Sequence, residues 1–304
     1  MQRKDALPHA ILLRGRMGVG KHDFAVNLSK ALLCERLDAS QQACGECASC
    51  KWLNEGTHPD FKRIAPEEDG ESLSKKKTSK KSQISVAQIR QLYNYLSLTS
   101  HQVDGRRIIL ISPAETLNIA SANALLKILE EPPANTLFLL VASQPQRLLP
   151  TIISRCQALD LPIPTKEDAI NWLKNQGVSN PEAALEYAGG APLKAFRMQA
   201  QLESNAALIK QLSLGHKLDP FVSAPSFLAI GMEQAVDIIQ KWTYDLVNFK
   251  LTQHSHYHSQ QVSAMQMLCK CVNLEVLLRF QRSLVEVKNA ANHPLSNEMQ
   301  LENI

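Results

Sequence analysis

The feature that most constrains how this chain can fold is a glycine-rich loop, GRMGVGKH, at residues 15–22. It follows the phosphate-binding pattern of a glycine, four residues, a second glycine and a lysine. Loops of this kind direct backbone N–H groups, a helix N-terminus and the lysine ammonium at phosphate oxygens. The residues that match this role are Gly15, Gly18, Gly20 and Lys21. The pattern predicts a strand, a loop and a helix in succession, arranged around a phosphate site.

The last position of the pattern departs from it. A serine or threonine normally stands there, and its hydroxyl ligates Mg²⁺, a cation that prefers oxygen. This chain has His22, whose side chain contains no oxygen. The loop is therefore a degenerate phosphate loop, and two alternatives stay open for it. It holds a nucleotide such as ATP passively, or it holds none.

A second departure follows the apolar run 107–111. In ATP-hydrolysing proteins with such a loop, acidic residues after this strand hold Mg²⁺ and orient the attacking water. Ser112 and Pro113 occupy those places here, and the first carboxylate along the chain is Glu115. We expect Glu115 to lie beyond reach of the metal. The two departures affect the same ion, so no magnesium site is expected.

Apolar runs alternate with amphipathic segments over the first half of the chain. The predicted strands are residues 10–13, 61–65, 107–111, 137–142 and a short one near 159–161. The predicted helices are residues 21–33, 84–98 and 118–131, the last one stopped by Pro132-Pro133. Their inward positions are predicted to be Phe24, Ala25, Leu28, Leu32 and Leu33, then Ile89, Leu92, Tyr93 and Leu96, then Ala120, Ala124, Leu125, Ile128 and Leu129. This alternation predicts an α/β domain with a mostly parallel sheet.

Four of the seven cysteines lie close together in the sequence: Cys34, Cys44, Cys47 and Cys50. Four thiolates suit a tetrahedral Zn²⁺ site, and Gly45 favours the turn that such spacing needs. An iron–sulfur cluster is the alternative metal centre, and unligated thiols around a helix end are the alternative without a metal. Because four protein ligands leave no position open for a substrate, a zinc site here would be structural.

The strand-like runs stop after Pro162, and the rest of the chain shows helical periodicity. The predicted helices there are residues 165–176, 181–188, 191–202, 227–251 and 263–288. The composition indicates three domains: an α/β domain at 1–161, a small helical domain at 162–203 and an all-α domain at 204–304.

Two polar segments interrupt this pattern. Residues 66–83 carry acidic residues and then five lysines, and are predicted to be an exposed loop, with a nucleic-acid-binding patch as the alternative. Residues 254–261 contain His254, His256 and His258 and are predicted to be a polar surface loop, with a metal site as the alternative. The net charge of +4 permits nucleic-acid contact without arguing for it. No apolar run reaches membrane-spanning length and no signal peptide is evident, so a cytoplasmic location without membrane contact is expected.

Four segments carry a family resemblance: residues 9–22, the four cysteines, NALLKILEEPP at 123–133, and Ser154-Arg155-Cys156. In this order they resemble the AAA+ subunits of the bacterial DNA polymerase III clamp loader, over the whole chain and most strongly from residue 9 to 156. The motor subunits of that family, gamma and tau, keep an intact loop and an Asp-Glu pair after the strand. The chain has His22, Ser112 and Pro113 there and lacks the long extension of tau. It therefore resembles the non-hydrolysing, or stator, type of subunit.

The resemblance implies an AAA+ α/β domain with a zinc module, a helical lid and an all-α collar that holds a hetero-pentamer together. It implies that Arg155, with Ser154 beside it, acts as an arginine finger on ATP bound by a neighbouring subunit. The implied partners are gamma or tau and delta, and, through the complex, the sliding clamp and primed DNA. The resemblance implies no ATPase activity of the chain's own. It implies that the chain is a component of the DNA-directed DNA polymerase III holoenzyme, and so belongs to a nucleotidyltransferase only by association. Two other functions stay open: a motor-type ATPase, and a zinc-dependent nucleic-acid-binding protein.

Overall fold

The computed structural model describes residues 7–38, 40–66, 83–97 and 105–290. The chain divides into two compact units, Met1–Ile163 and Pro164–Ile304, which are described separately below. The predicted lysine-rich loop of residues 66–83 lies, apart from its two end residues, outside the described residues. Among the described residues, no helix combines the length and the apolar character needed to cross a membrane.

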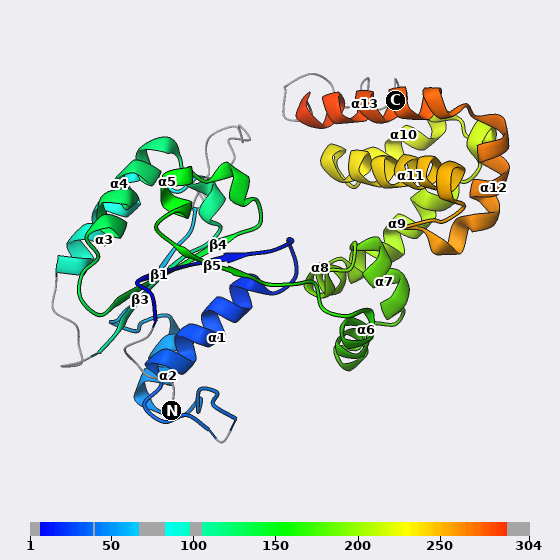
Figure 1. Ribbon diagram of the computed structural model, residues 1–304. Helices are drawn as coiled ribbons and strands as arrows, with labels where there is room; N and C mark the ends of the chain where they lie inside the picture. The colour runs from blue at the N-terminus through cyan, green and yellow to red at the C-terminus, as the bar shows by residue number, and fades with distance from the viewer. Residues whose placement is uncertain (1–6, 39, 67–82, 98–104, 291–304) are drawn as a thin grey trace. The chain divides into compact units, whose positions relative to one another are not determined.

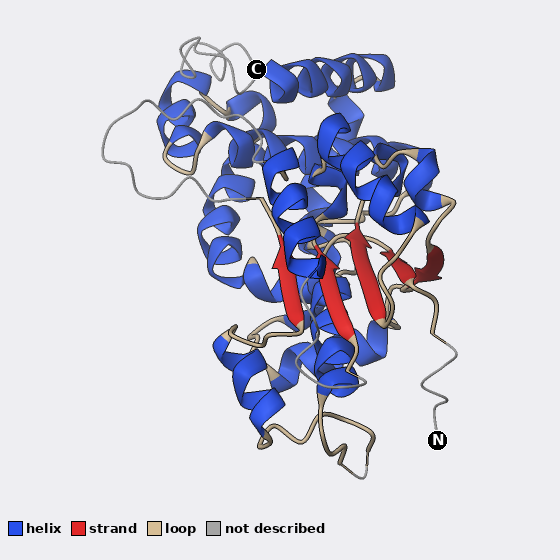
Figure 2. Ribbon diagram, turned by 90° about the vertical axis from the view of Figure 1, so that its left-hand side faces the viewer, coloured by secondary structure: helices blue, strands red, loops and turns tan. Residues whose placement is uncertain are grey.

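The first unit is built on a parallel sheet of five strands in the order β2-β3-β4-β1-β5. The strands are β1 Ala10–Arg14, β2 Phe61–Ile64, β3 Arg107–Ile111, β4 Thr136–Ala142 and β5 Gln157–Asp160. The strand before the glycine loop, β1, lies between β4 and β5, with Leu12 beside Leu140 on one side and Ala158 on the other. Figure 2 shows the strands side by side between helices. The predicted α/β domain with a mostly parallel sheet is confirmed.

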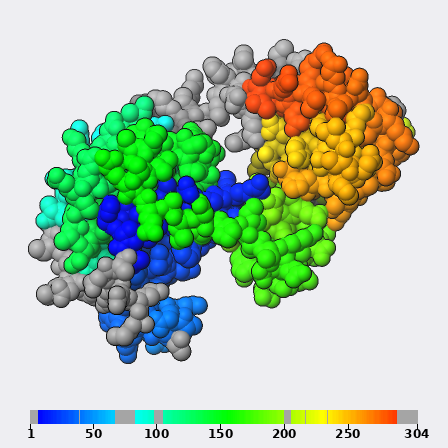
Figure 3. Space-filling view, viewed as in Figure 1, coloured from blue at the N-terminus to red at the C-terminus, as the bar shows by residue number. Residues whose placement is uncertain are grey.

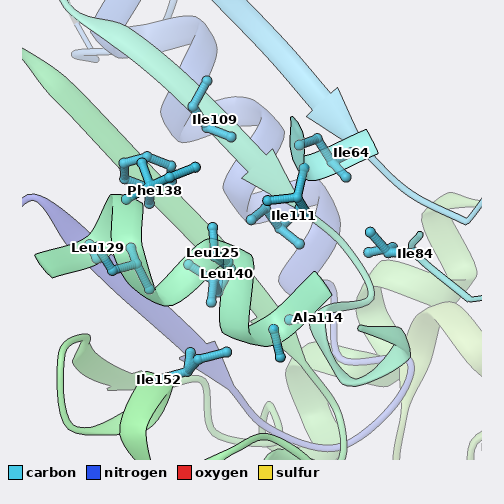
Figure 4. Packing of buried hydrophobic residues seen from close by; sticks show 14 of the residues in the cluster. Ile64, Ile84, Ile109, Ile111, Ala114, Leu125, Leu129, Phe138, Leu140 and Ile152 are labelled. Atoms are coloured by element: carbon cyan, nitrogen blue, oxygen red, sulfur yellow. The ribbon is translucent and has the colours of Figure 1, made fainter. Parts of the chain in front are cut away.

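Helices cover both faces of this sheet (Figure 1). They are α1 Lys21–Leu33, α2 Ala48–Glu55, α3 Val86–Ser97, α4 Ile119–Glu130 and the short α5 Pro150–Ile153. Because successive strand residues point to opposite faces, each strand supplies two cores. Ile109 and Ile111 pack with α3, α4 and α5, whereas Ile108 and Leu110 pack with α1. Figure 4 shows the first of these cores, in which side chains of α4 meet those of β4.

Three predicted inward positions in these helices were wrong. Phe24, Tyr93 and Ala120 are exposed. In α1 the buried stripe is narrow and follows Ala25, Ser29 and Leu33, which places Phe24 at its solvent edge. In α4, Ala122 is buried in place of Ala120, because the stripe also contains Leu125 and Leu129 and follows their helical spacing.

Every regular element described in the second unit is helical. The α-helices are α6 Lys166–Asn175, α7 Pro181–Tyr187, α8 Pro192–Arg197, α9 Gln199–Leu212, α10 Pro220–Leu228, α11 Met232–Thr252, α12 Val262–Cys271 and α13 Leu274–Ala290. One hydrophobic cluster joins α6, α7 and α8, and a second one joins α9 to α13 and includes Tyr187 at the end of α7. Figure 3 shows α11 to α13, yellow to orange-red, as one contiguous body.

Three predicted helices in this unit are each divided in two. The predicted helix 191–202 becomes α8 and α9, which meet at Met198. The predicted helix 227–251 is interrupted by Gly231, whose φ of 89° is the left-handed region that favours glycine. The predicted helix 263–288 is interrupted at Val272, which has extended backbone, and Asn273 then accepts a hydrogen bond from the N–H of Glu275. At Gly231 and Asn273, residues typical of turns therefore interrupt a helix even though the apolar periodicity continues past them.

The prediction that the three histidines of residues 254–261 lie in a surface loop was wrong for His258, which is buried and 6% exposed. Its Nδ1 lies 2.8 Å from Oδ2 of Asp245, a fully buried residue of α11. The same carboxylate accepts the backbone N–H groups of His256, Tyr257 and His258. Burial acts to raise the pKa of Asp245, but the hydrogen bonds from His258, His256 and Tyr257 outweigh it and lower that pKa. Asp245 therefore anchors the loop between α11 and α12 as a carboxylate.

We expect Asp245→Asn to lower the free energy of unfolding by about 1–3 kcal/mol at neutral pH, because charge-assisted hydrogen bonds to the loop are lost. The pKa of Asp245 is lower in the folded than in the unfolded protein. Its contribution to the free energy of unfolding is therefore complete above its unfolded-state pKa of about 3.9, and it is lost as the pH falls through its folded-state pKa. Urea unfolding at pH 7 and pH 3 measures this, with Glu286→Gln, an exposed carboxylate of α13, as the control. A difference between wild type and variant that stays constant over this pH range would contradict the anchoring role.

Candidate functional site

The glycine loop leaves the carboxyl end of β1 and ends where α1 begins at Lys21. A Cβ atom on Gly15 would lie 2.6 Å from the backbone oxygen of Leu161, so the close approach of the two chain segments excludes any side chain there. Gly20, which caps α1, has a φ of 95° and needs the freedom of glycine as well. The backbone geometry alone therefore requires glycine at positions 15 and 20.

Lys21 is 4% exposed and is bound to the loop itself. Its Nζ donates to the backbone oxygens of Gly15 at 2.8 Å and Arg16 at 2.6 Å. Burial lowers the pKa of Lys21, and the nearby carboxylate of Glu115 acts in the opposite direction. The ammonium that would meet phosphate in a working loop is here satisfied by carbonyls and faces an acidic residue.

The two positions that would supply magnesium ligands contact each other. Nδ1 of His22 lies 3.1 Å from Oγ of Ser112, within hydrogen-bond distance. Glu115, in the 3-10 turn Ala114–Thr116, accepts the backbone N–H of Ser143 at 3.0 Å, just beyond β4. Its other oxygen is buried, and no described residue hydrogen-bonds to it. Glu115 was expected to be remote from the site, yet its charge reaches Lys21.

The four cysteines converge at the carboxyl end of α1 and the amino end of α2. All four sulfur atoms lie within 4.8 Å of one another, and none forms a disulfide. The Sγ atom of Cys34 is 3.6 Å from that of Cys44 and 4.0 Å from that of Cys47. A tetrahedral zinc with bonds of about 2.3 Å requires sulfur atoms about 3.8 Å apart. The cluster therefore fits a four-thiolate metal site.

Backbone amides also point at these sulfur atoms. The N–H groups of Cys44, Cys47 and Cys50 donate to the sulfur atoms of Cys34, Cys44 and Cys47 in turn, at 3.3–3.4 Å. Hydrogen bonds from the backbone of Glu46 and Cys47 lower the pKa of Cys44 to about 6. Burial raises the pKa of Cys50 to about 12, so its ionisation calls for a bound cation.

The Ser154-Arg155-Cys156 segment follows α5 and leads into β5. The backbone oxygen of Thr151 accepts hydrogen bonds from Oγ of Ser154 at 3.0 Å and from Nη1 of Arg155 at 3.1 Å. The side chain of Cys156 packs against the core between the sheet and α4, and burial raises its pKa to about 11. Cys156 thus faces inward, while the side chain of Arg155 is 35% exposed.

Comparison with known proteins identifies the family of the chain. Residues 1–165 match the family model described as "DNA polymerase III, delta subunit". The DNA polymerase III subunit delta' of Pseudomonas aeruginosa is 36% identical over 252 residues, which cover 80% of this chain and 73% of that protein. The chain belongs to the family of DNA polymerase III delta' subunits.

Two further similarities concern the delta' family and a solved structure. The delta' subunit of Haemophilus influenzae is 32% identical over 254 residues, which cover 82% of this chain and 73% of that subunit. The crystal structure of a DNA polymerase III gamma subunit-related protein from Thermotoga maritima superposes with a TM-score of 0.43 and 16% sequence identity. The match covers 95% of this chain and 96% of that protein's chain. The family named from sequence motifs is confirmed by the delta' relatives.

In this delta' family member, the predicted site residues fall into three separate groups. Gly15, Gly18, Gly20 and Lys21 lie at the carboxyl edge of the sheet, the cysteines lie beyond α1, and Ser154 and Arg155 precede β5 at its amino edge. Sequence reasoning named Glu115 only as a carboxylate beyond reach of the metal, and it gave no role to Glu130, the carboxylate that contacts Arg155. Both are distant in sequence from the groups they contact, and the only signal for Glu130 was its place in the LEEPP segment.

Proposed function

We propose that the chain is a clamp-loader subunit of DNA polymerase III that runs no ATP cycle of its own and supplies Arg155 to ATP bound by a neighbouring motor subunit. The observation that carries this proposal is the position of Arg155 relative to the chain's own loop. β1 and β5 are parallel, with Ile11 beside Gln157 and Arg14 beside Asp160. Arg155 therefore lies near the start of the strands, and the glycine loop follows their end.

The distance between these edges favours action on another subunit. A parallel strand rises about 3.3 Å per residue, so the two edges are separated by roughly 13 Å or more. An arginine finger must place its guanidinium directly on the transferred phosphoryl group. Arg155 is too far from its own loop for this task, whereas its exposure leaves it accessible to a nucleotide on a neighbouring molecule.

The contact between His22 and Ser112 supports the lack of hydrolysis. Proteins that hydrolyse ATP hold Mg²⁺ through a hydroxyl at the position of His22 and through acidic residues at the positions of Ser112 and Pro113. Here the two side chains hydrogen-bond to each other, and Lys21 is bound to carbonyls of the loop. The rival motor-type function would require a divalent ion held by an imidazole and a serine, a poor ligand set for Mg²⁺.

The four-cysteine cluster is proposed to hold a structural zinc ion. Its residues would be Cys34, Cys44, Cys47 and Cys50, which fill all four positions of a tetrahedron. The bound ion would fix the geometry between α1 and α2. Since it has no open ligand position, it would take no part in the chemistry of ATP.

We propose partners and domains in line with the delta' family. The partners are gamma or tau and delta in a hetero-pentamer, with the sliding clamp and primed DNA met through the complex in the cytoplasm. The domains are the AAA+ domain at 1–161, a lid at 162–203 and a collar at 204–304. The hydrophobic cluster of α6–α8 supports a lid and that of α9–α13 supports a collar, while Tyr187 at the end of α7 packs into the collar cluster.

Reconstitution with gamma or tau and delta tests this function. We expect no Mg²⁺-dependent ATP hydrolysis by the purified chain, because it lacks the oxygen ligands for the ion. Adding the chain to gamma and delta should restore clamp-stimulated hydrolysis by the complex. Steady hydrolysis by the chain alone, independent of DNA and of the other subunits, would contradict the proposal.

A further inference from the structure

Arg155 makes an ion pair with a residue of the LEEPP segment. Its Nη2 lies 2.5 Å from Oε1 of Glu130, the last residue of α4. We propose that Glu130 is the positioning residue for Arg155, holding the guanidinium ready for a phosphate on the neighbouring subunit. This inference rests on the proposed function of Arg155 as an arginine finger.

The structure fixes both members of the pair through their neighbours in the chain. Glu130 follows Leu129, which is buried in the core between α4 and the sheet, and α4 ends there before Pro132-Pro133. Arg155 lies between α5, whose Ile152 is buried in the same core, and the inward-facing Cys156. Figure 4 shows Leu129 and Ile152 within this core. The two charged side chains therefore project from two rigid supports.

The pair is placed to orient the arginine rather than to stabilise the fold. The side chains of Arg155 and Glu130 are 35% and 50% exposed. Ion pairs with such exposure contribute little to folding, because water and salt screen them. Their geometric effect persists, since Glu130 and the backbone oxygen of Thr151 hold the guanidinium from two directions.

The two contacts leave the arginine able to bind phosphate. A guanidinium has five N–H donors in a fixed fork. The contacts with Thr151 and Glu130 use one donor on each terminal nitrogen, which leaves three for an incoming phosphate. Without Glu130, the Arg155 side chain would lose its rotamer freedom only when it binds the phosphate. That entropy loss would lower the rate by a factor of up to about 30.

Glu130→Gln tests this role in the complete clamp loader reconstituted with gamma and delta. Arg155→Ala first defines the part of the clamp-stimulated ATPase that depends on this finger. We expect Glu130→Gln to reduce that part by about 5- to 30-fold, through kcat, because the KM for ATP belongs to the subunit that binds the nucleotide. Glu131→Gln is the matched control, since Glu131 is the adjacent exposed glutamate and Arg155 pairs with Glu130. Glu130→Asp, which keeps the charge on a shorter side chain, should fall between wild type and Glu130→Gln.

The outcomes separate this inference from the function it rests on. If Arg155→Ala leaves the ATPase unchanged, the arginine-finger proposal fails and this inference falls with it. If Arg155→Ala lowers the rate and Glu130→Gln does not, only the positioning role is overturned. A further loss when Glu130→Gln is added to Arg155→Ala also overturns it, because a residue that acts only through Arg155 has no effect in its absence. Thermal unfolding of Glu130→Gln should match wild type, which checks that the protein stays folded.

Discussion

Replacing Arg155 by alanine should lower ATP turnover at the neighbouring site by about 10³-fold, while the clamp loader still assembles. The guanidinium is planar and always charged, so it stabilises charge on the transferred phosphoryl group, and such fingers contribute roughly 10³–10⁵ in rate. The loss in total activity will be smaller, because sites between other subunits continue to turn over. Single-turnover hydrolysis by the reconstituted complex measures the affected site.

Assembly of the Arg155→Ala complex can be checked by size-exclusion chromatography. Its fold should be intact, since the side chain is partly exposed and, within the part of the chain that the structure describes, hydrogen-bonds to Glu130 and Thr151. Arg90→Ala is the matched control, because Arg90 is an exposed arginine on α3 of the same unit. An assembled Arg155→Ala complex with a wild-type single-turnover rate at every site would rule out the finger.

Removing the proposed zinc should unfold the segment between α1 and β2. Binding free energies of structural zinc in small modules are about 10–16 kcal/mol, far more than a short segment with few buried side chains can supply itself. The segment is also tied to the domain by Ser49, whose Oγ donates to the backbone oxygen of Leu33 at 2.7 Å and lies 2.8 Å from Nε2 of His58. We expect amide exchange to rise from Cys34 to His58, with the sheet largely unchanged.

Metal analysis and hydrogen exchange of Cys47→Ser measure this effect. Wild type should contain about one zinc ion per chain, and Cys47→Ser should lose it, because four thiolates close the site. Cys271→Ser is the control, since Cys271 is an exposed thiol outside the cluster. Visible absorption and bound iron in wild type would favour the iron–sulfur alternative, and unchanged zinc in Cys47→Ser would exclude Cys47 as a ligand.

Local patterns predicted the first unit well. The bounds of α1 follow from Gly20 and from an apolar stripe that lies close by in the sequence. In the second unit, Gly231 and Asn273 divide helices that the apolar periodicity joins, because a single turn residue carries a weaker signal than a long repeat. His258 lies in a polar stretch, and only its contact with Asp245 on another element explains its burial.

The same limit applies to the candidate site. The loop glycines, the cysteines and Arg155 belong to short motifs, so their positions could be predicted. Glu130 meets Arg155 across 25 residues, and Glu115 meets Ser143 across 28. Such contacts depend on how helices lie on the sheet, which no local pattern specifies. The sequence therefore identified the groups with chemistry but did not predict the contacts of the carboxylates Glu115 and Glu130 with them.

The contact between His22 and Ser112 has a consequence for how such a loop could change over generations. A hydrolysing site needs an oxygen ligand at position 22 and a carboxylate near position 112. Changing His22 alone removes the ring nitrogen that the buried Ser112 hydroxyl contacts, and changing Ser112 alone sets a carboxylate against the imidazole. Neither single change makes a magnesium site, so the two substitutions are epistatic. A lineage can lose hydrolysis through one substitution, but it must make at least two to recover it.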